Sequence, residues 1–525
     1  MNAIQAELVS SKVIVRNPAT QEPIGSVNNS SAAEIAEAVR RAHGAQHRWA
    51  EVPVRERLAL IKRFQQLLCS QKEAIASLIS REAGKPKAEA LATEVLVALD
   101  TTQYLLRKTA SFLRPERIPH GNPAMKLKSG ALLRQPYGVI GIISPWNYPF
   151  SLPTVQTLAA LVTGNAVVLK PSEFTPFSSL EMQRLLREAG LDPDLLQVVT
   201  GDGSAGVALL GADINKLIFT GSVATGKRVA QAAAARLLPL VLELGGKDPM
   251  IVLDDADLEV ASSAAVWGAF MNAGQTCLSV ERCYVHQSVY EKFLGSCIAK
   301  TAKLRVGNGA DDSTDVGPLI HERQLRTVRE HVEDAVAHGA RLLAGGKALP
   351  NLGPSFFAPT ILADVTHDMR IMQEETFGPV LPVCSFQTED EAVSLANDSA
   401  FGLAASIWTR NRSRGEALAR RIDAGTVMVN DVISCFGISE APHGGVKASG
   451  IGRTHGRFGL EEMVWPKYVD SDRLPGMKKL WWYSYGPEFA SQMAGFVELL
   501  FAQNVFHRLK GGLKSARSFL RRKPV

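Results

Sequence analysis

The feature that most constrains the fold is an alternation of short apolar runs with helical patterns in the first half of the chain. Apolar runs of strand length lie at 139–143, 166–169, 196–199 and 217–220, and helical patterns occur around 154–162, 180–189 and 222–234. Strands that alternate with helices form βαβ units, whose strands pair in parallel beneath covering helices. We therefore expect an α/β protein built on a mostly parallel sheet.

The same alternation restarts around Leu242–Val252, which predicts a boundary between a cofactor-binding domain and a second α/β domain. A chain of 525 residues is long enough for two or three domains. The segment Lys126–Arg134 alternates polar and apolar residues, and we expect it to form a hairpin arm outside the main sheet.

The cysteines favour a reducing compartment, because they show no paired spacing that would indicate a disulfide framework or a zinc site. The six are Cys69, Cys277, Cys283, Cys297, Cys384 and Cys435. The segment Met1–Ser10 has no basic flank followed by an apolar core, so we expect no secretory signal and a cytoplasmic protein. No metal site is expected.

The positive charge is concentrated at the C-terminus. From Asp472 onward the chain contains ten of its 58 Lys/Arg residues but only three of its 52 Asp/Glu residues, so the rest is close to neutral. A neutral body does not support nucleic-acid binding.

Cys277 follows Gly-Gln-Thr, which predicts an exposed thiol where a helix gives way to a loop. A nucleophilic cysteine needs exposure and a lowered pKa to attack a carbonyl carbon. The alternative is an ordinary core residue, because free cysteines are among the most buried residues.

Two segments at the ends of predicted strands could bind a dinucleotide. In Thr220–Gly226, Gly221, Ser222 and Gly226 open a helix whose free amides favour a phosphate, although a tight strand-to-helix turn would read the same way. Lys170 and Glu173 end another strand. Glu173 could bind ribose hydroxyls and repel a 2′-phosphate, which favours NAD over NADP, but an exposed ion pair that caps the next helix is the alternative.

Other motifs carry chemistry of a different kind. Trp146 and Asn147 lie in a turn between two prolines, where a fixed amide could stabilise an oxyanion, or where the Asn serves only the turn. Glu243 lies in an apolar run before Gly-Gly, which predicts a raised pKa and a general base, with an N-cap acid as the alternative. Glu374–Pro379, with Glu375 and Phe377, reads as a turn.

Taken in order, the motifs WNYP, VLKPSE, FTGS, LELGGK, GQTC, EETFGPV and GGVKASG resemble those of the aldehyde dehydrogenase superfamily, from about Val15 to about Lys467. The resemblance implies that Cys277 is the nucleophile, Glu243 the base, and Asn147, with the Cys277 backbone N–H, the oxyanion donor. It further implies that Trp146, Lys170, Glu173, Gly221, Ser222, Gly226, Glu375 and Phe377 bind the cofactor.

The resemblance also implies a fold and an assembly. It places a Rossmann-like NAD-binding domain in residues 1–120 and 140–245, and an α/β catalytic domain in 246–445. A small β oligomerisation arm and bridging segment would occupy 121–139 and 446–471, followed by a C-terminal extension at 472–525. A homodimer or homotetramer is expected.

The implied reaction is the oxidation of an aldehyde to a carboxylic acid with NAD, or alternatively NADP, through a thioester on Cys277 that a Glu243-activated water hydrolyses. Relatives that transfer the acyl group to coenzyme A tend to lack the acid. Tyr148, Leu152, Leu278, Ser279, Phe436 and Ile438 predict a largely apolar pocket and hence an aliphatic or aromatic aldehyde. A succinate-semialdehyde dehydrogenase is the alternative, and a non-catalytic structural or binding relative is an alternative of another class.

The segment 474–525 departs from the usual end of the family. Trp481–Tyr483 and Tyr485 precede an apolar stretch, Phe489–Phe506, and a basic stretch, Arg508–Lys523. The apolar stretch contains Glu498 and is too short for a membrane span. An amphipathic helix at a membrane surface fits this pattern, which predicts a peripheral membrane protein. The alternative is that the helix docks on its own subunit or on a partner.

Overall fold

The computed structural model describes residues 12–476, 478–479, 481–483 and 485–521, so the expectation for Met1–Ser10 lies outside the described residues. The chain divides into two compact units. The first consists of Met1–Arg114 and Arg134–Pro466, and the second of Pro115–Leu133 and Lys467–Val525.

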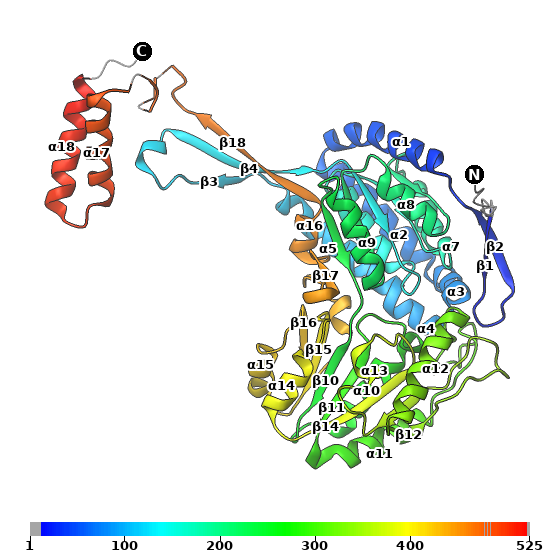
Figure 1. Cartoon of the computed structure of the whole chain (residues 1–525). Coiled ribbons are helices and arrows are strands. Elements are labelled where there is room, and N and C mark those ends of the chain that lie inside the picture. The colour runs from blue at the N-terminus through cyan, green and yellow to red at the C-terminus, as the bar shows by residue number, and fades with distance from the viewer. Residues whose placement is uncertain (1–11, 477, 480, 484, 522–525) are drawn as a thin grey trace, which may run out of the picture. The chain divides into compact units, whose positions relative to one another are not determined.

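A six-stranded sheet of the first unit contains the four strands that the apolar runs predicted (Figure 1). In spatial order its strands are β17 (Gly450–Ile451), β9 (Leu240–Glu243), β8 (Lys216–Thr220), β5 (Val139–Ile143), β6 (Ala166–Lys170) and β7 (Leu196–Val198). All neighbours pair in parallel except β17 with β9. The strands β5 and β6 are buried almost throughout, as strands covered on both faces are.

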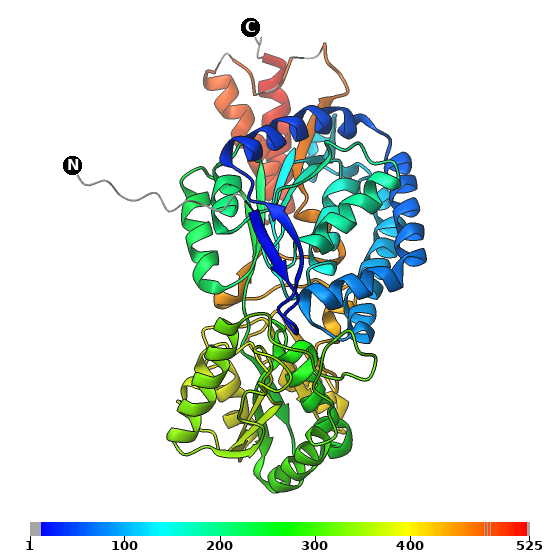
Figure 2. The same ribbon diagram turned by 90° about the vertical axis from the view of Figure 1, so that its right-hand side faces the viewer.

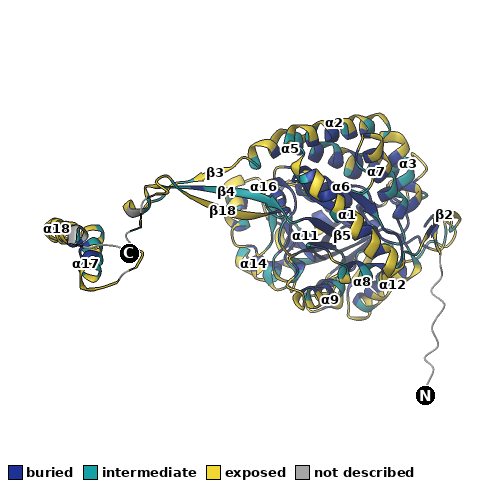
Figure 3. Cartoon of the chain, turned by 90° about the horizontal axis from the view of Figure 1, so that it is seen from above, coloured by how far each residue is buried: buried dark blue, intermediate teal, exposed yellow. Residues whose placement is uncertain are grey.

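Helices cover both faces of this sheet, and β5 is visible between them in Figure 3. They are α1 (Ala32–Glu51), α2 (Val54–Ser70), α3 (Lys72–Ala83), α4 (Lys87–Ala90), the π-helical turn η1 (Leu91–Val95), α5 (Leu96–Phe112), α6 (Ser151–Val162), α7 (Pro176–Glu188), α8 (Gly203–Gly211), α9 (Val223–Ala234) and α16 (Gly456–Glu461). The helix α1 begins with a capping box, in which Ser31 Oγ accepts from Glu34 N and Glu34 Oε2 accepts from Ser31 N. A short hairpin of β1 (Lys12–Arg16) and β2 (Pro23–Asn28) precedes it.

A second, seven-stranded sheet follows in the same unit and is parallel except for the pair β12–β13 (Figure 2). Its order is β12 (Arg341–Ala344), β13 (Thr360–Ala363), β14 (Val380–Phe386), β11 (Val280–His286), β10 (Asp248–Val252), β15 (Ala404–Trp408) and β16 (Thr426–Val429). Its helices are α10 (Leu258–Phe270), α11 (Tyr290–Thr301), α12 (Glu322–Ala337), α13 (Arg370–Gln373), α14 (Glu389–Asn397) and α15 (Arg412–Ala419). Each large sheet has its own hydrophobic core, and the chain passes between the sheets at residues 244–247.

The second unit contains a three-stranded antiparallel sheet and a pair of helices. The sheet has the order β18 (Val464–Asp472), β4 (Lys128–Pro136) and β3 (Glu116–Ile118), so the expected hairpin arm has a third strand from the C-terminal part of the chain. The two helices are α17 (Pro487–Phe501) and α18 (Val505–Arg521).

The tail therefore differs from the single amphipathic helix that its sequence predicted. The chain leaves the helical conformation at Ala502, where ψ is 138°. Asn504 Oδ1 then accepts from Phe506 N at 2.8 Å, and Arg508 Nε donates to the Ala502 carbonyl at 2.7 Å. This polar turn produces two helices that pack against each other.

Candidate active site

Cys277, Glu243 and Asn147 line one cleft of about 510 Å³ in the first unit. The expected dinucleotide contacts that line the same cleft are Trp146, Lys170, Glu173, Gly221, Ser222, Glu375 and Phe377. Several of these residues lie at the carboxyl ends of β5, β6, β8 and β9, where ligands bind in open parallel sheets. Ten of the eleven residues expected from the sequence are thus brought together.

A tight turn precedes the cysteine. Asn272, Ala273 and Gly274 all adopt left-handed conformations, with φ of 53°, 54° and 72°. At Gly274 a Cβ atom would lie only 2.0 Å from the Gly378 carbonyl oxygen, so no side chain fits there. The turn delivers Cys277 to the cleft from the end of α10, as the helix-to-loop prediction implied.

Side-chain amides fix the position of this turn relative to Asn147. Asn272 Nδ2 donates to the backbone carbonyls of Asn147 and Gln275, both at 3.1 Å. Asn147 Nδ2 donates to the same Gln275 carbonyl at 3.1 Å, which uses one of its two hydrogens. The Asn147 amide is therefore held beside the nucleophile turn in a single orientation.

The thiol differs from the expectation of an exposed group with a lowered pKa. Cys277 is half-buried, and burial raises its pKa well above 9. The carboxyl groups of Asp248, Glu243 and Glu375 raise the pKa further, because each of them repels a thiolate when it is ionised. In the ligand-free protein the thiol therefore carries its proton at neutral pH.

Glu243 ends β9 and is 4% exposed. Neither of its carboxyl oxygens has a hydrogen-bond partner, and burial raises its pKa well above 4.5. It lies at the end of a strand and starts no helix, so the structure excludes the alternative of an N-cap acid. A buried carboxyl group without partners has the character of a general base.

A histidine that the sequence did not single out lies beside this acid. His443 Nε2 is 3.9 Å from Glu243 Oε2, and His443 also lines the cleft. Burial lowers the pKa of His443 to about 4, so its ring is neutral at physiological pH. The ring packs edge-on against Phe436, with centroids 5.0 Å apart, and a second buried histidine, His455, packs against both rings.

A buried ion pair, also missed from the sequence, supports the Asn147 loop. Lys85 Nζ lies 2.8 Å from Glu94 Oε1, and both side chains are fully buried. Glu94 Oε2 accepts from the backbone N–H groups of Phe150 and Ser151, at the start of α6. Lys85 Nζ also lies 3.8 Å from the ring centroid of Tyr148.

At the other end of the cleft, Lys170 and Glu173 form an ion pair, with Nζ and Oε2 3.5 Å apart. It differs from the exposed, helix-capping pair of the alternative interpretation, because Lys170 is buried and α7 has no side-chain cap. Lys170 is 4% exposed, whereas about a third of the Glu173 side chain is open to the cleft. Ser172 Oγ contacts the same carboxylate oxygen at 3.4 Å. The pair does not exclude the ribose contact, because Glu173 keeps oxygen surface for a hydroxyl group.

The N-terminus of α9 faces the cleft through Gly221, Ser222 and Thr225. Ser222 is the N-cap, and its hydroxyl accepts from Thr225 N at 3.4 Å. Gly226 differs from the expectation, because it does not line the cleft. A Cβ atom there would lie 2.5 Å from Leu244 Cδ2, so this glycine allows α9 to pack closely on the 244–247 segment.

Glu375 and Phe377 lie on a turn that a second buried ion pair fixes in place. Lys247 Nζ pairs with Glu281 Oε2, and Glu281 accepts from Thr376 N at 3.0 Å and Phe377 N at 2.8 Å. Glu375 Oε1 accepts from Gly246 N at 3.2 Å, and burial raises the Glu375 pKa to about 8.

The aromatic ring of Phe377 packs edge-on against Trp146, with centroids 5.5 Å apart. The cleft thus offers the contacts that a nicotinamide dinucleotide requires. The backbone amides at the N-terminus of α9 can bind phosphates, the Glu173 and Glu375 carboxylates can accept from ribose hydroxyls, and the two rings form an apolar wall for the base. The residues present therefore fit this cofactor.

The expected substrate pocket differs in detail from the sequence prediction. Leu152 lines the cleft, but Leu278 and Ser279 are core residues, 3% and 1% exposed. The Tyr148 hydroxyl is engaged with Thr276 Oγ1 at 2.8 Å. Ile438 is 49% exposed and does not line the cleft.

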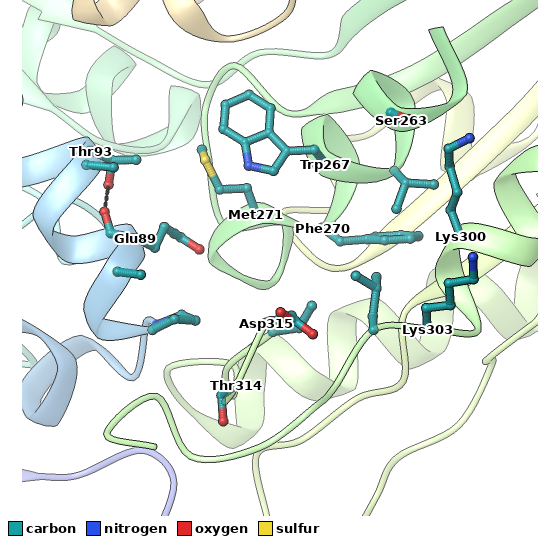
Figure 4. Close-up of a pocket in the computed structure, with 16 residues that line it drawn as sticks. Glu89, Thr93, Ser263, Trp267, Phe270, Met271, Lys300, Lys303, Thr314 and Asp315 are labelled. Carbon is teal, nitrogen blue, oxygen red and sulfur yellow. Dashed lines mark hydrogen bonds between the residues drawn. The ribbon is translucent and has the colours of Figure 1, made fainter. Parts of the chain in front are cut away.

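A separate cavity of about 600 Å³ lies behind the nucleophile turn, where Glu89, Trp267, Phe270 and Met271 surround a common space (Figure 4). Glu89 Oε2 accepts from Asn272 N at 3.1 Å. None of the proposed catalytic residues lines this cavity. The cavity is connected to the active site through Glu89, which holds the turn that precedes Cys277.

Comparison with known proteins gives a consistent result. The profile of the aldehyde dehydrogenase family matches residues 6–469. A 4,4′-diapolycopene aldehyde oxidase from Methylomonas sp. is 41% identical over 87% of this chain and 85% of its own. A protein from Mycolicibacterium smegmatis, provisionally named succinate-semialdehyde dehydrogenase [NADP(+)], is 39% identical over 87% of both chains.

Solved structures agree with the sequence comparisons. The NAD⁺ complex of an aldehyde dehydrogenase from Bacillus cereus has a TM-score of 0.84 and 36% identity, covering 88% of this chain and 93% of that one. The NAD⁺ complex of the Mycobacterium tuberculosis aldehyde dehydrogenase has a TM-score of 0.84 and 34% identity, covering 88% and 95%.

Proposed function

This chain belongs to the aldehyde dehydrogenase family, and we propose that it oxidises an apolar aldehyde to the carboxylic acid with NAD⁺, through a thioester on Cys277. The observation that carries the proposal is the shared cleft, in which Cys277, Asn147 and Glu243 lie with the groups that fit the dinucleotide. This arrangement also disfavours a non-catalytic relative, because both the nucleophile and the base are present.

In the proposed first step, Cys277 gives its proton to a water molecule in the cleft, and its sulfur attacks the aldehyde carbon. The second amide hydrogen of Asn147 and the backbone N–H of Cys277 stabilise the oxygen that becomes negative. When bound, the nicotinamide cofactor accepts a hydride, with its electron pair, from the substrate carbon. Collapse of the oxyanion leaves an acyl group joined to the sulfur of Cys277 as a thioester.

In the proposed second step, Glu243 takes a proton from water, and the resulting hydroxide attacks the thioester carbon. The carbon–sulfur bond breaks, the carboxylic acid leaves, and Glu243 passes its proton to the Cys277 sulfur, which regenerates both the thiol and the base. The absence of hydrogen bonds to Glu243 supports this role, because both oxygens are available to a water molecule. The same acid favours hydrolysis over acyl transfer to coenzyme A.

NAD is proposed as the preferred cofactor because the Glu173 carboxylate is expected to bind the adenosine ribose and would repel a 2′-phosphate there. Lys170, a cation that lines the same cleft, is already paired with Glu173. A relative carries NADP(+) in its name, so NADP is the alternative to test in parallel.

An apolar aldehyde is favoured over succinate semialdehyde by the charges of the cleft. Of the described residues that line it, the only arginine is Arg323, beside His321. The His321 ring packs 4.9 Å from Phe174, which adjoins Glu173 at the cofactor end. A substrate carboxylate at the Cys277 end would therefore lack an arginine partner. One relative is named for 4,4′-diapolycopene aldehyde and another for succinate semialdehyde, so both substrates belong in the test.

The test is NADH production across short, long, aromatic and carboxylated aldehydes, with NADP⁺ in parallel. We expect kcat/KM to be at least about tenfold higher for apolar aldehydes than for succinate semialdehyde, since a buried unpaired carboxylate is costly. The variant Cys277→Ala should lose turnover but still bind NAD⁺. A variant that kept most of its activity would contradict the mechanism.

A homodimer or homotetramer is also proposed. It is supported by β18, an edge strand of the three-stranded sheet whose residues are mostly exposed, because an open edge offers unpaired backbone groups to another chain. Light scattering of the purified protein would give its mass, and a monomer would contradict this proposal.

Finally, we propose that the segment 474–525 contacts a membrane surface. Its aromatic, apolar and basic residues support this contact. Deletion of this segment should release the protein from the membrane pellet of fractionated cells. A truncated protein that stayed in the pellet would contradict a membrane contact by this segment.

A further inference from the structure

The helical hairpin of α17 and α18 has an inverted distribution of side chains. In the described part of the hairpin the buried residues are small or polar, whereas large apolar side chains around the turn are exposed. Figure 3 shows exposed stretches along both helices. A hairpin folded by the hydrophobic effect in water shows the opposite pattern. Helices that pack in lipid show this pattern, because lipid supplies the apolar contacts on the outside.

The interface between the two helices is built from small residues. A Cβ atom on Gly495 would lie 2.5 Å from the Gly511 carbonyl oxygen, and one on Gly511 would lie 2.4 Å from Glu498 Cβ. Gln492 is 2% exposed and Ser518 is 9% exposed. The helices thus approach closely through glycine and polar side chains, as in small-residue interfaces within membranes.

The outside of the hairpin carries a large apolar surface around the turn. The exposed fractions are 57% for Val497, 73% for Phe501, 70% for Val505, 70% for Phe506, 63% for Leu509 and 63% for Leu513. An apolar surface of this kind is rare on a protein that remains in water and marks a contact site.

Basic residues run beside this surface on α18. Lys510, Lys514 and Arg517 recur at helical spacing and form one stripe, next to the apolar stripe of Leu509 and Leu513. The sequence from 487 to 521 has five basic and two acidic residues. The charge matches an anionic surface, whereas two copies of the hairpin would repel each other.

The hairpin is too short to cross a bilayer. Its helices contain 15 and 17 residues, which correspond to about 22 Å and about 26 Å at 1.5 Å per residue. Among the described residues, no helix is long and apolar enough to span a membrane. An apolar hairpin with a basic flank suits the boundary between headgroups and acyl chains.

From these observations we propose that the α17–α18 hairpin inserts its apolar turn end into the interface of an anionic bilayer, with Lys510, Lys514 and Arg517 at the lipid phosphates. This inference rests on the proposed membrane contact of 474–525 and specifies its mode: insertion of a preformed hairpin. It would hold the enzyme at the surface where apolar aldehydes dissolve.

The test uses the full-length protein and sedimentation with vesicles of phosphatidylcholine, alone or mixed with phosphatidylglycerol. We expect binding to the mixed vesicles that persists in high salt. The variant Phe501→Ser/Phe506→Ser should weaken this binding at least about tenfold, because it removes two inserted rings. The variant Lys510→Gln/Lys514→Gln/Arg517→Gln should lose the preference for the anionic vesicles.

The matched control is Val336→Ser/Leu352→Ser, which changes two apolar side chains, 42% and 40% exposed, on the first unit. It should bind vesicles as the wild type does. NADH production from a water-soluble aldehyde should be unchanged in all three variants, so aldehyde oxidation is tested separately from lipid binding.

Two results would overturn insertion. Binding that high salt or the charge variant abolishes, but that Phe501→Ser/Phe506→Ser leaves intact, would indicate surface attraction without insertion. Alternatively, the protein could bind neither kind of vesicle, and the mass of its assembly in lipid-free solution could fall in the Phe501→Ser/Phe506→Ser variant. These results would indicate that a second copy of the chain covers the apolar surface around the turn. That outcome would also overturn the membrane contact, whereas the measured NADH production would be unaffected.

Discussion

His443 Nε2 lies 3.9 Å from Glu243 Oε2, and each side chain is 5% exposed. The pair consists of a carboxyl group with a raised pKa and an imidazole with a lowered pKa, both in surroundings that penalise charge. Because its pKa is lowered, the imidazole is a weaker base than the Glu243 carboxylate and takes no proton from it; the ring instead packs beside the carboxyl group and limits its orientation. We infer that His443 is a positioning residue for the base.

The variant His443→Phe should therefore slow hydrolysis of the thioester more than its formation. We expect steady-state turnover to fall by about ten- to a hundredfold, at the lower end of general acid–base effects. The first, rapid burst of NADH should survive, because hydride transfer precedes hydrolysis. Stopped-flow absorbance separates the two phases, and loss of the burst would instead place His443 in the first step.

Alkylation of the thiol should depend steeply on pH. The nucleophile is the thiolate, and a pKa raised above 9 means that the thiolate fraction falls as pH falls through the whole neutral range. In the cofactor-free enzyme, the rate of iodoacetamide inactivation should rise about tenfold per pH unit between about pH 7 and 9. A plateau below pH 7 would show that the thiol has a lowered pKa.

Replacement of Glu173 should relax the choice of cofactor. In Glu173→Gln the charge that repels a 2′-phosphate is gone, and Lys170 loses its ionic partner. We expect the ratio of kcat/KM for NADP⁺ to that for NAD⁺ to rise at least about tenfold, a modest electrostatic effect. Steady-state kinetics with both cofactors measures it, and an unchanged ratio would argue against a ribose contact at Glu173.

The buried Lys85–Glu94 pair should be important for stability. Lys85→Met leaves Glu94 buried without its cation, which typically costs about 3–5 kcal/mol of the free energy of unfolding. Urea denaturation measures this loss. The exposed pair of Glu37 and Arg40 provides the control, since Glu37→Gln should leave stability nearly unchanged. Equal effects of the two variants would contradict the structural role of Lys85.

The sequence predicted the main sheet well because its strands are signalled locally. Val139–Ile143 and Ala166–Lys170 are apolar over their whole length, as strands buried on both faces must be. The expected cleft residues also came together, except for Gly226, whose small size serves packing on Leu244.

What the sequence could not show depends on long-range contacts. His443 reaches Glu243 because β17 pairs with β9, with Gly450 opposite Glu243. The raised pKa of Cys277 arises first from its burial and then from carboxyl groups that are distant in sequence, such as Glu243 and Glu375. The tail was predicted as one amphipathic helix because the break at Ala502 and the close approach of Gly495 to Gly511 depend on contacts between its two halves.

The central claim is that a thioester forms on Cys277 and that Glu243 is needed to hydrolyse it. Intact-protein mass spectrometry of Glu243→Gln, mixed with NAD⁺ and an apolar aldehyde, tests both parts. The claim predicts a stable mass increase equal to the acyl group, located on Cys277 after digestion and absent from Cys277→Ala/Glu243→Gln. A Glu243→Gln enzyme that turned over normally, or that reduced NAD⁺ without acylating Cys277, would contradict it.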